Sequence, residues 1–416
     1  MYRRSETGLW VFTLFTTNEI PSVVVMFVAL IMFLQMGVGM DMATVYAAVL
    51  LWPRAAQPLM RRLLSGSAGG VLDLNLLRAT ECLTAVVMGL FALWMGGDPL
   101  QTLGMLLCIS TLAAWHDLLA HRYFAARMNR PDGRPLSVVR VLSTQMATVL
   151  TYGLMLMAVG VLEIYFRQRA MWYSWALCCY ILAGVYMLLA MVNMLLLGRT
   201  EGMPLPPARQ GRRRQWMVQA IVLALLLLPQ GLMFYCRTIF LLARPRQGGL
   251  GCTLQEVGFA QGTVGVIAFL LGVTVGRQMQ HRWGEARMEL PLTMCLGLSP
   301  LVYLTMTQCP PDGLPVLSGY TFLAQLLFGL GLAGCQRRIA YISGDRYRNA
   351  VNPISIPIIS LCLLPTLAAS GYLARRLSFG GFFLLDTLCA PVAWMAVAAI
   401  SRYYQMDGRG NDVRPS

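Results

Sequence analysis

Residues 9–35 of the chain read LWVFTLFTTNEIPSVVVMFVALIMFLQ and contain a single charged side chain, Glu19. A bilayer core about 30 Å thick is crossed by about 20 mostly apolar residues in a helix, so this segment is long enough to span a membrane. Its apolar run is also too long for the hydrophobic region of a cleavable signal peptide. We therefore expect the chain to begin with a transmembrane helix.

Apolar segments of similar length recur along the whole chain of 416 residues. The composition agrees, since 57% of the residues are hydrophobic and 12% are charged, against about 45–50% and about 25% in soluble domains. This balance excludes a soluble enzyme and predicts an all-α integral membrane protein. We expect twelve transmembrane helices, at residues 9–35, 42–60, 76–95, 100–120, 138–161, 172–197, 216–242, 254–276, 288–307, 317–342, 354–373 and 379–400.

The positive charges predict the orientation of these helices. The net charge is +15, and all 33 basic residues are Arg. If the N-terminus is cytoplasmic, 24 Arg lie beside helix ends on the cytoplasmic side and six on the other side, which is the asymmetry typical of bacterial inner-membrane proteins. We expect both termini in the cytoplasm. A nucleic-acid partner is excluded, because the surplus Arg residues are spread over seven separate cytoplasmic segments without a basic and aromatic groove.

The longest link between helices, residues 198–215, contains three Pro and the run Arg212-Arg213-Arg214. It separates a predicted N-terminal six-helix bundle, residues 1–197, from a C-terminal six-helix bundle, residues 216–402, which is followed by a cytoplasmic tail, residues 403–416. Two bundles of six helices with both termini inside are typical of the major facilitator fold, whose substrate site lies between the halves near the midplane. We expect a monomer.

Glu19 and Arg54 are the most informative charges inside the predicted helices, because charges in the hydrocarbon region are costly and are usually functional or paired. Glu19 lies about ten residues, or about 15 Å, into the first helix, in the polar sequence Thr16-Thr17-Asn18-Glu19-Ile20-Pro21. We interpret it as a carboxylate that lines a cavity and binds substrate or carries a proton; the alternative is a structural pair with an Arg. Arg54 either holds an acidic substrate group or neutralises Glu19 or Glu81.

The end of the fourth predicted helix contains Asp117 and His121, which are four residues apart and so share one helix face. They would relay a proton or form part of a cytoplasmic gate, or they are an interfacial stabilising pair. Arg337 and Arg338, at the matching end of the tenth helix, are candidate partners of Asp117 in a closed gate.

Three other charged residues receive structural interpretations. We expect Glu81 to be solvated or paired locally near a helix end, and Asp386 to be packed in a helix outside the cavity. Arg237 is expected to extend to the periplasmic membrane surface, and the alternative is a ligand-binding role. Of eleven Cys, only Cys252 and Cys309 fall in predicted periplasmic loops, where a disulfide is one option.

No metal-ligand spacing, nucleophile elbow or catalytic dyad occurs in the sequence, so we expect neither an enzyme nor a cofactor. Residues 329–334 do fit the pattern G-x-G-x-x-G, but they lie inside an apolar helix. Close helix packing through small residues explains them better than nucleotide binding does.

Four stretches of the chain form a recognisable set: Asn18-Glu19-Ile20-Pro21, Gln57-Pro58-Leu59-Met60, residues 110–123 and residues 324–371. Together they resemble the AmpG-type muropeptide permeases of the major facilitator superfamily. Asp117 stands at the family's first Asp, and Asn349-Ala350-Val351-Asn352 occupies the place of a family element. The resemblance implies proton-driven import of cell-wall fragments that consist of sugars and peptides.

The chain departs from this family at three places. The family's acidic residue just beyond the second helix is missing from Met60-Arg61-Arg62-Leu63. Gln57 stands where the family has Lys, and His121 stands where it has a second acid; Arg54, one turn before Gln57, would supply the missing cation. From these residues we expect a proton-coupled importer of a sugar or glycopeptide such as an anhydromuropeptide. The site would comprise Asn18, Glu19, Arg54, Gln57, Asp117 and His121. The alternatives are an exporter of drugs or metabolites and a membrane sensor that does not transport.

Overall fold

The computed structural model describes residues 2–64, 71–127, 136–166, 171–198, 213–343 and 355–408, and every regular element in these ranges is a helix. Most of the predicted linker and tail, and Asn349-Ala350-Val351-Asn352, lie outside them. The elements are α1 (Tyr2–Val23), η1 (Val24–Val28), α2 (Ala29–Gln35), α3 (Met40–Val49), α4 (Trp52–Ala55), α5 (Gln57–Leu64), α6 (Val71–Leu93), α7 (Pro99–Arg127), α8 (Leu136–Thr148), η2 (Val149–Leu154), α9 (Met155–Tyr165), α10 (Met171–Leu196), α11 (Arg213–Leu242), η3 (Pro245–Gln247), α12 (Leu254–Val257), η4 (Gly258–Val264), α13 (Gly265–Trp283), α14 (Glu285–Gln308), α15 (Leu314–Ser343) and α16 (Ser355–Gly408).

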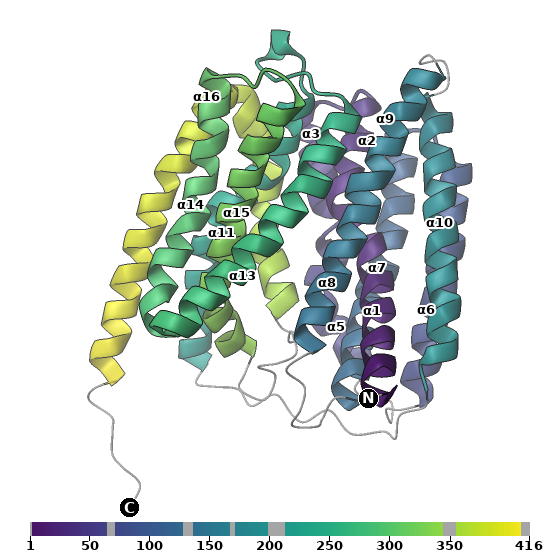
Figure 1. Cartoon of the computed structure of the whole chain (residues 1–416), viewed down its shortest axis with the longest axis horizontal. Coiled ribbons are helices and arrows are strands. Elements are labelled where there is room, and N and C mark those ends of the chain that lie inside the picture. The colour runs from purple at the N-terminus through teal and green to yellow at the C-terminus, as the bar shows by residue number, and fades with distance from the viewer. Residues whose placement is uncertain are drawn as a thin grey trace, which may run out of the picture.

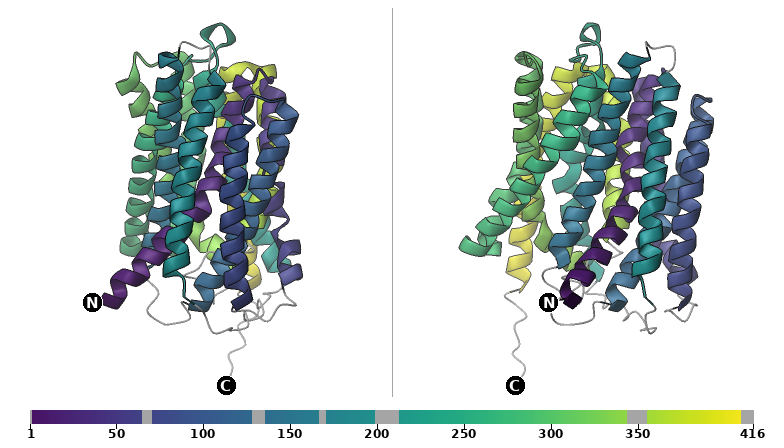
Figure 2. Two further views of the ribbon diagram at one scale, coloured as in Figure 1. Left: turned by 90° about the vertical axis from the view of Figure 1, so that its right-hand side faces the viewer. Right: turned by 45° about the vertical axis from the view of Figure 1, so that its right-hand side comes forward.

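The long helices stand side by side in one bundle (Figures 1 and 2). Within the described ranges, nine of them are long and apolar enough to cross a membrane, from Gly8–Gln35 to Leu314–Gln336. The start of α1 and the end of α16 lie at the same end of the bundle (Figure 1). The prediction of a multi-pass, all-helical membrane protein is therefore confirmed.

Two predicted helix boundaries differ from the structure. The segment predicted at 42–60 is divided into α3, α4 and α5, because Pro53 and Pro58 lack the N–H groups that would continue the helical hydrogen bonds. Tight turns replace them, with Leu51 N donating to Ala48 O. Conversely, the last two predicted helices are joined in α16, which changes direction at Ser378, where φ is 61°.

Three of the long helices contain a π-helical segment within their length. η1 interrupts the first span, η2 lies between α8 and α9, and η4 lies between α12 and α13. Such segments are rare and are frequently found at functional sites. No pattern in the sequence predicts them.

The glycines of residues 329–334 bring α15 close to its neighbours. A Cβ at Gly329 would overlap the backbone of α13 at Phe269, and one at Gly331 would lie 2.8 Å from the backbone nitrogen of Leu296 in α14. The prediction that this motif serves helix packing is confirmed.

Gly331→Val is expected to lower the stability of the protein by about 1–3 kcal/mol, because overpacking forces the helices apart. Thermal unfolding of the purified protein measures the change. Gly319→Val, on the same helix, is the matched control, since a Cβ there meets nothing within 4 Å. Equal losses in both variants would contradict the packing argument.

Helices α3 and α16 meet near the end of the bundle opposite the N-terminus (Figure 1). Arg375 Nη1 lies 2.8 Å from Asp41 Oδ2, and Thr44 Oγ1 donates to Ala368 O at 3.3 Å. A Cβ at Gly371 would overlap the backbone of α3 at Met40. The contact therefore combines an exposed ion pair with close backbone packing.

Asp41→Asn is expected to open this contact only slightly, because exposed ion pairs contribute about 0.2–1 kcal/mol. Although burial acts to raise it, the pKa of Asp41 is lowered overall by backbone hydrogen bonds and by Arg375. At pH values above the usual Asp pKa the pair stabilises the contact, and its contribution is lost as the pH falls through the lowered pKa.

Distances between spin labels on the exposed ends of α3 and α16 measure how far the contact opens. Gly371→Leu should separate them more than Asp41→Asn does; the reverse order would refute the argument.

Candidate functional site

The polar segment of α1 is the starting point of the site. Pro21 has no N–H, so it leaves the carbonyl of Thr17 without its usual helical partner. Nearby hydroxyl groups bond back to the helix, with Thr17 Oγ1 donating to Thr13 O at 2.8 Å and Ser22 Oγ donating to Asn18 O at 3.2 Å. This segment presents Asn18 and Glu19 to the helices that pack against α1.

Asp117 of α7 is held by hydrogen bonds from three other predicted site residues. Asn18 Nδ2 donates to its Oδ1 at 2.9 Å, Gln57 Nε2 donates to its Oδ2 at 2.9 Å, and His121 Nδ1 lies 3.3 Å from Oδ1. His121 Nδ1 also donates to the Asp117 carbonyl at 2.7 Å, which leaves His121 Nε2 buried without a partner. With donors on both oxygens, Asp117 is stabilised as a carboxylate.

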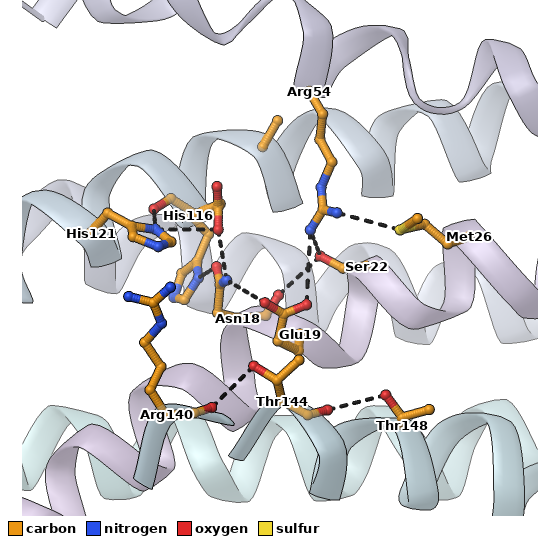
Figure 3. A network of polar contacts seen from close by, with 12 residues as sticks. Asn18, Glu19, Ser22, Met26, Arg54, His116, His121, Arg140, Thr144 and Thr148 are labelled. Atoms are coloured by element: carbon orange, nitrogen blue, oxygen red, sulfur yellow. Dashed lines mark hydrogen bonds and ion pairs between the residues drawn. The ribbon is translucent and has the colours of Figure 1, made fainter. Parts of the chain in front are cut away.

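Glu19 and Arg54 face each other at a longer distance. Arg54 Nη2 lies 4.0 Å from Glu19 Oε2 and donates to Ser22 Oγ at 2.6 Å. The other terminal nitrogen, Arg54 Nη1, lies 3.4 Å from Met26 Sδ (Figure 3). Glu19 also receives a long hydrogen bond of 3.5 Å from Asn18 Nδ2. The Arg54 guanidinium is therefore only loosely engaged by a carboxylate and retains donors for another acceptor.

Arg140 of α8 is a site residue that was not singled out from the sequence. Its guanidinium lies 5.0 Å from the centroid of the Phe15 ring and points toward the cluster that contains His121 (Figure 3). It interacts electrostatically with Asp117 and Glu19. Two Arg side chains thus approach Glu19 from different helices.

Glu81 does not behave as predicted. It is fully buried in α6, and its Oε1 accepts a 2.7 Å hydrogen bond from Asn193 Nδ2 of α10 and lies 3.1 Å from His116 Nε2 of α7. The prediction of a solvated or locally paired carboxylate is wrong. Glu81, His116 and Asn193 extend the site through the interior of the bundle.

The hydrogen bonds fix where the proton of His116 lies. Asn18 Nδ2 donates to Asp117, so Asn18 Oδ1 must accept the 2.9 Å hydrogen bond from His116 Nδ1. His116 Nε2 then faces Glu81 Oε1 with one proton between them, because two bare acceptors would repel each other. The pair is either an imidazolium with a carboxylate or an imidazole with a carboxylic acid, and both forms are neutral overall.

The structure leaves the predicted gate untested. Arg337 and Arg338 lie in α15, but their side chains are outside the described part of the chain, so their pairing with Asp117 stays a prediction. Arg237 is 6% exposed, and the prediction that it extends to the membrane surface is wrong.

Asp386 is fully buried, and neither carboxylate oxygen has a hydrogen-bond partner. Cys252 and Cys309 are both free thiols. No group of three potential metal ligands occurs among the described residues.

Chemically, the site offers a loosely paired carboxylate, two guanidinium groups and a buried pair that shares one proton. These groups are suited to bind protons and anions.

Comparisons with known proteins agree with the fold. A bacterial homologue of the human lysosomal transporter Spinster, in an inward-facing and occupied conformation, has a TM-score of 0.67 and 12% identity, with 96% of this chain and 97% of that chain covered. A POT family peptide transporter has a TM-score of 0.67 and 11% identity, with 98% of each chain covered. A D-xylose-proton symporter has a TM-score of 0.66 and 12% identity, with 94% and 96% covered.

These neighbours are transporters of the major facilitator type, not enzymes, and the chain shares their fold. No protein-family model and no curated protein matches the sequence.

Proposed function

We propose that the chain is a secondary active transporter that works by alternating access. The broken segment α3 to α5 and the two limbs of α16 on either side of Ser378 would complete twelve membrane crossings, six in residues 1–197 and six in residues 216–402. The likeness in fold to known transporters supports this proposal. The contact between α3 and α16 would close one entrance of the transport path in this conformation.

The observation that carries the proposal is the state of Glu19. Its side chain is 21% exposed and its nearest guanidinium nitrogen is 4.0 Å away, whereas the Asp117 and Glu81 side chains are 3% and 0% exposed and hydrogen-bonded. A carboxylate with these loose contacts can take up and release a proton with little rearrangement. We assign proton coupling to Glu19, and the positioning of its surroundings to Asn18, Gln57, Asp117 and His121.

The substrate we propose is a sugar or glycopeptide such as an anhydromuropeptide. The resemblance of several stretches to AmpG-type permeases supports this choice, and so do the two guanidinium groups of Arg54 and Arg140, which suit the carboxylates of such a molecule. Gln57 replaces the family's Lys, but its amide is used to hold Asp117. Arg54 would therefore supply the cation.

We further propose that the protein lies in the bacterial inner membrane as a monomer with both termini in the cytoplasm. The surplus of Arg on one side of the predicted helices supports this orientation, and protons would enter from the opposite side together with the substrate.

Uptake of labelled anhydromuropeptide into proteoliposomes, with and without an imposed pH gradient, tests the proposal. We expect accumulation only with the gradient. Uptake that ignores the gradient would refute proton coupling, and a lack of uptake of this or related sugars would refute the substrate. Binding without flux would favour a sensor. Sensitivity to hydrophobic cations in cells that lack the protein would favour an exporter.

A further inference from the structure

Arg237 is a buried cation whose guanidinium has no anionic partner in the described part of the chain. It lies in α11, five residues before the end of the helix at Leu242, and only 6% of its surface is exposed. Its Nε is buried without a hydrogen-bond partner, and its Cζ lies 5.2 Å from the centroid of the Phe234 ring. Buried charges in membrane proteins are costly and are normally paired. An unpaired one therefore requires an explanation.

Asp386 is a buried acid near this part of α11, but it does not neutralise Arg237. It interacts electrostatically with Cys236, the residue beside Arg237, and its carboxylate oxygens have no hydrogen-bond partner. Adjacent residues of an α-helix point about 100° apart, so the side chains of Cys236 and Arg237 face different neighbours. The side of α11 that carries Arg237 faces another set of residues.

Aromatic rings form one wall beside Arg237. The rings of Phe27 and Phe234 have centroids 4.9 Å apart, and Phe27 and Tyr152 have the same separation. Phe27 belongs to η1, Tyr152 to η2 and Phe234 to α11, so three membrane helices contribute to this wall. Such rings bind flat apolar faces, including those of sugars.

Uncharged polar groups form the other wall. The Tyr152 hydroxyl lies 3.2 Å from Thr238 Oγ1 and donates to Gln261 Oε1 at 3.4 Å, and Gln261 Nε2 donates to the Tyr303 hydroxyl at 3.3 Å. Arg237 interacts electrostatically with both Tyr152 and Tyr303. These groups are suited to bind hydroxyl and amide groups, but none of them carries a negative charge.

All three π-helical segments of the described residues supply a residue to these two walls. Phe27 lies in η1, Tyr152 in η2 and Gln261 in η4. η2 and η4 also touch, since a Cβ at Gly262 would overlap the backbone at Gly153. Three rare elements that converge on one unpaired cation indicate a functional site and not only a packing feature.

We propose that Arg237, with Phe27, Tyr152, Gln261 and Tyr303, forms a second binding site, which holds the carboxylate of a sugar acid as the helices close around it. The inference rests on the proposed transport function. An empty site leaves a buried cation uncompensated in the closed arrangement, whereas a bound carboxylate forms charge-assisted hydrogen bonds with the guanidinium. A ligand favours one conformation only through contacts that differ between conformations, and Arg237 supplies such a contact.

This site is separate from the cluster around Glu19. Phe27 follows Glu19 by eight residues in the first span, which corresponds to a rise of about 12 Å. The carboxylate bound by Arg237 and the proton bound by Glu19 would therefore occupy different places.

Binding of N-acetylmuramic acid and N-acetylglucosamine to the purified full chain in lipid nanodiscs tests the inference, because the first sugar differs from the second by a carboxylate-bearing lactyl group. We expect the wild type to bind the acid at least about tenfold more tightly. Arg237→Gln should weaken binding of the acid about 10- to 100-fold and leave binding of the neutral sugar unchanged. Arg282→Gln, an exposed arginine that also stacks on a ring, is the matched control and should change neither.

Thermal unfolding without ligand shows whether the variant is damaged. Arg237→Gln should unfold at the same or a higher temperature than the wild type, since it removes an unpaired buried charge. Equal loss of both sugars, an unchanged preference in Arg237→Gln, or no binding of either sugar to the wild type would overturn the inference. If the preference depends on Arg237 but anhydromuropeptide is not taken up, the proposed substrate fails and the carboxylate site stands.

Discussion

Glu19→Gln is expected to abolish proton-driven accumulation of substrate in proteoliposomes and to preserve exchange of substrate between the two sides. Glutamine keeps the shape of the side chain and can still accept the hydrogen bond from Asn18, but it cannot carry a proton. A gradient of one pH unit corresponds to about 1.36 kcal/mol and sustains about tenfold accumulation in one-to-one symport. That ratio should fall to about one in the variant.

The control for this experiment is Glu163→Gln. Glu163 is a half-buried acid near the end of α9, and it accepts a 3.3 Å hydrogen bond from Gln35. The same chemical change there should leave accumulation at the wild-type value. If Glu19→Gln retains tenfold accumulation per pH unit, Glu19 is not the proton carrier, even if the protein is a transporter.

The sequence indicates which residues belong to the site better than it indicates which residues they contact. Asn18, Gln57 and Asp117 are conspicuous because they are polar within long apolar runs, and the structure brings all three together. Their contacts join residues 99 and 60 positions apart. Such pairings depend on how helices pack, which hydropathy does not reveal.

The environment of Glu81 differs from the expected one because Glu81 lies deeper in its helix than the hydropathy pattern predicts. The expected helix began at residue 76, whereas α6 begins at Val71, so Glu81 lies ten residues inside the helix and not five. His116 adjoins Asp117, and a histidine in an apolar run could have indicated the buried partner of Glu81.

The position of Arg237 differs from the expected one for another reason. Its distance from the helix end does allow a long side chain to reach the surface, but this requires a side chain that faces lipid. α11 packs closely against α14 and α16, and the Arg237 side chain is turned inward. The π-helical segments that surround it leave no pattern in the sequence, because they follow from contacts between distant helices.

Glu81→Gln is expected to destabilise the protein by about 1–3 kcal/mol, because His116 loses the buried partner with which it shares a proton. His116 Nδ1 must still donate to Asn18, and Asn193 still requires an acceptor at position 81. A glutamine oxygen there can accept the hydrogen bond from Asn193, but the same oxygen then faces His116 Nε2. If His116 Nε2 is protonated, the imidazolium has no counter-charge; if it is not, two acceptors face each other. Thermal unfolding of the purified protein measures the loss.

A double-mutant cycle separates this pair from general damage to the bundle. His116→Gln should also destabilise the protein, but Glu81→Gln/His116→Gln should lose less than the sum of the single changes, since two neutral amides can bond to each other where a lone charge cannot. Asp312→Asn, at an exposed acid in a loop, makes the same chemical change away from the pair and should be neutral. Additive losses in the cycle would mean that His116 and Glu81 share no proton. The link from Glu81 to a neighbouring helix would then depend on its hydrogen bond from Asn193 of α10, and Asn193→Ala should be the most destabilising of these variants.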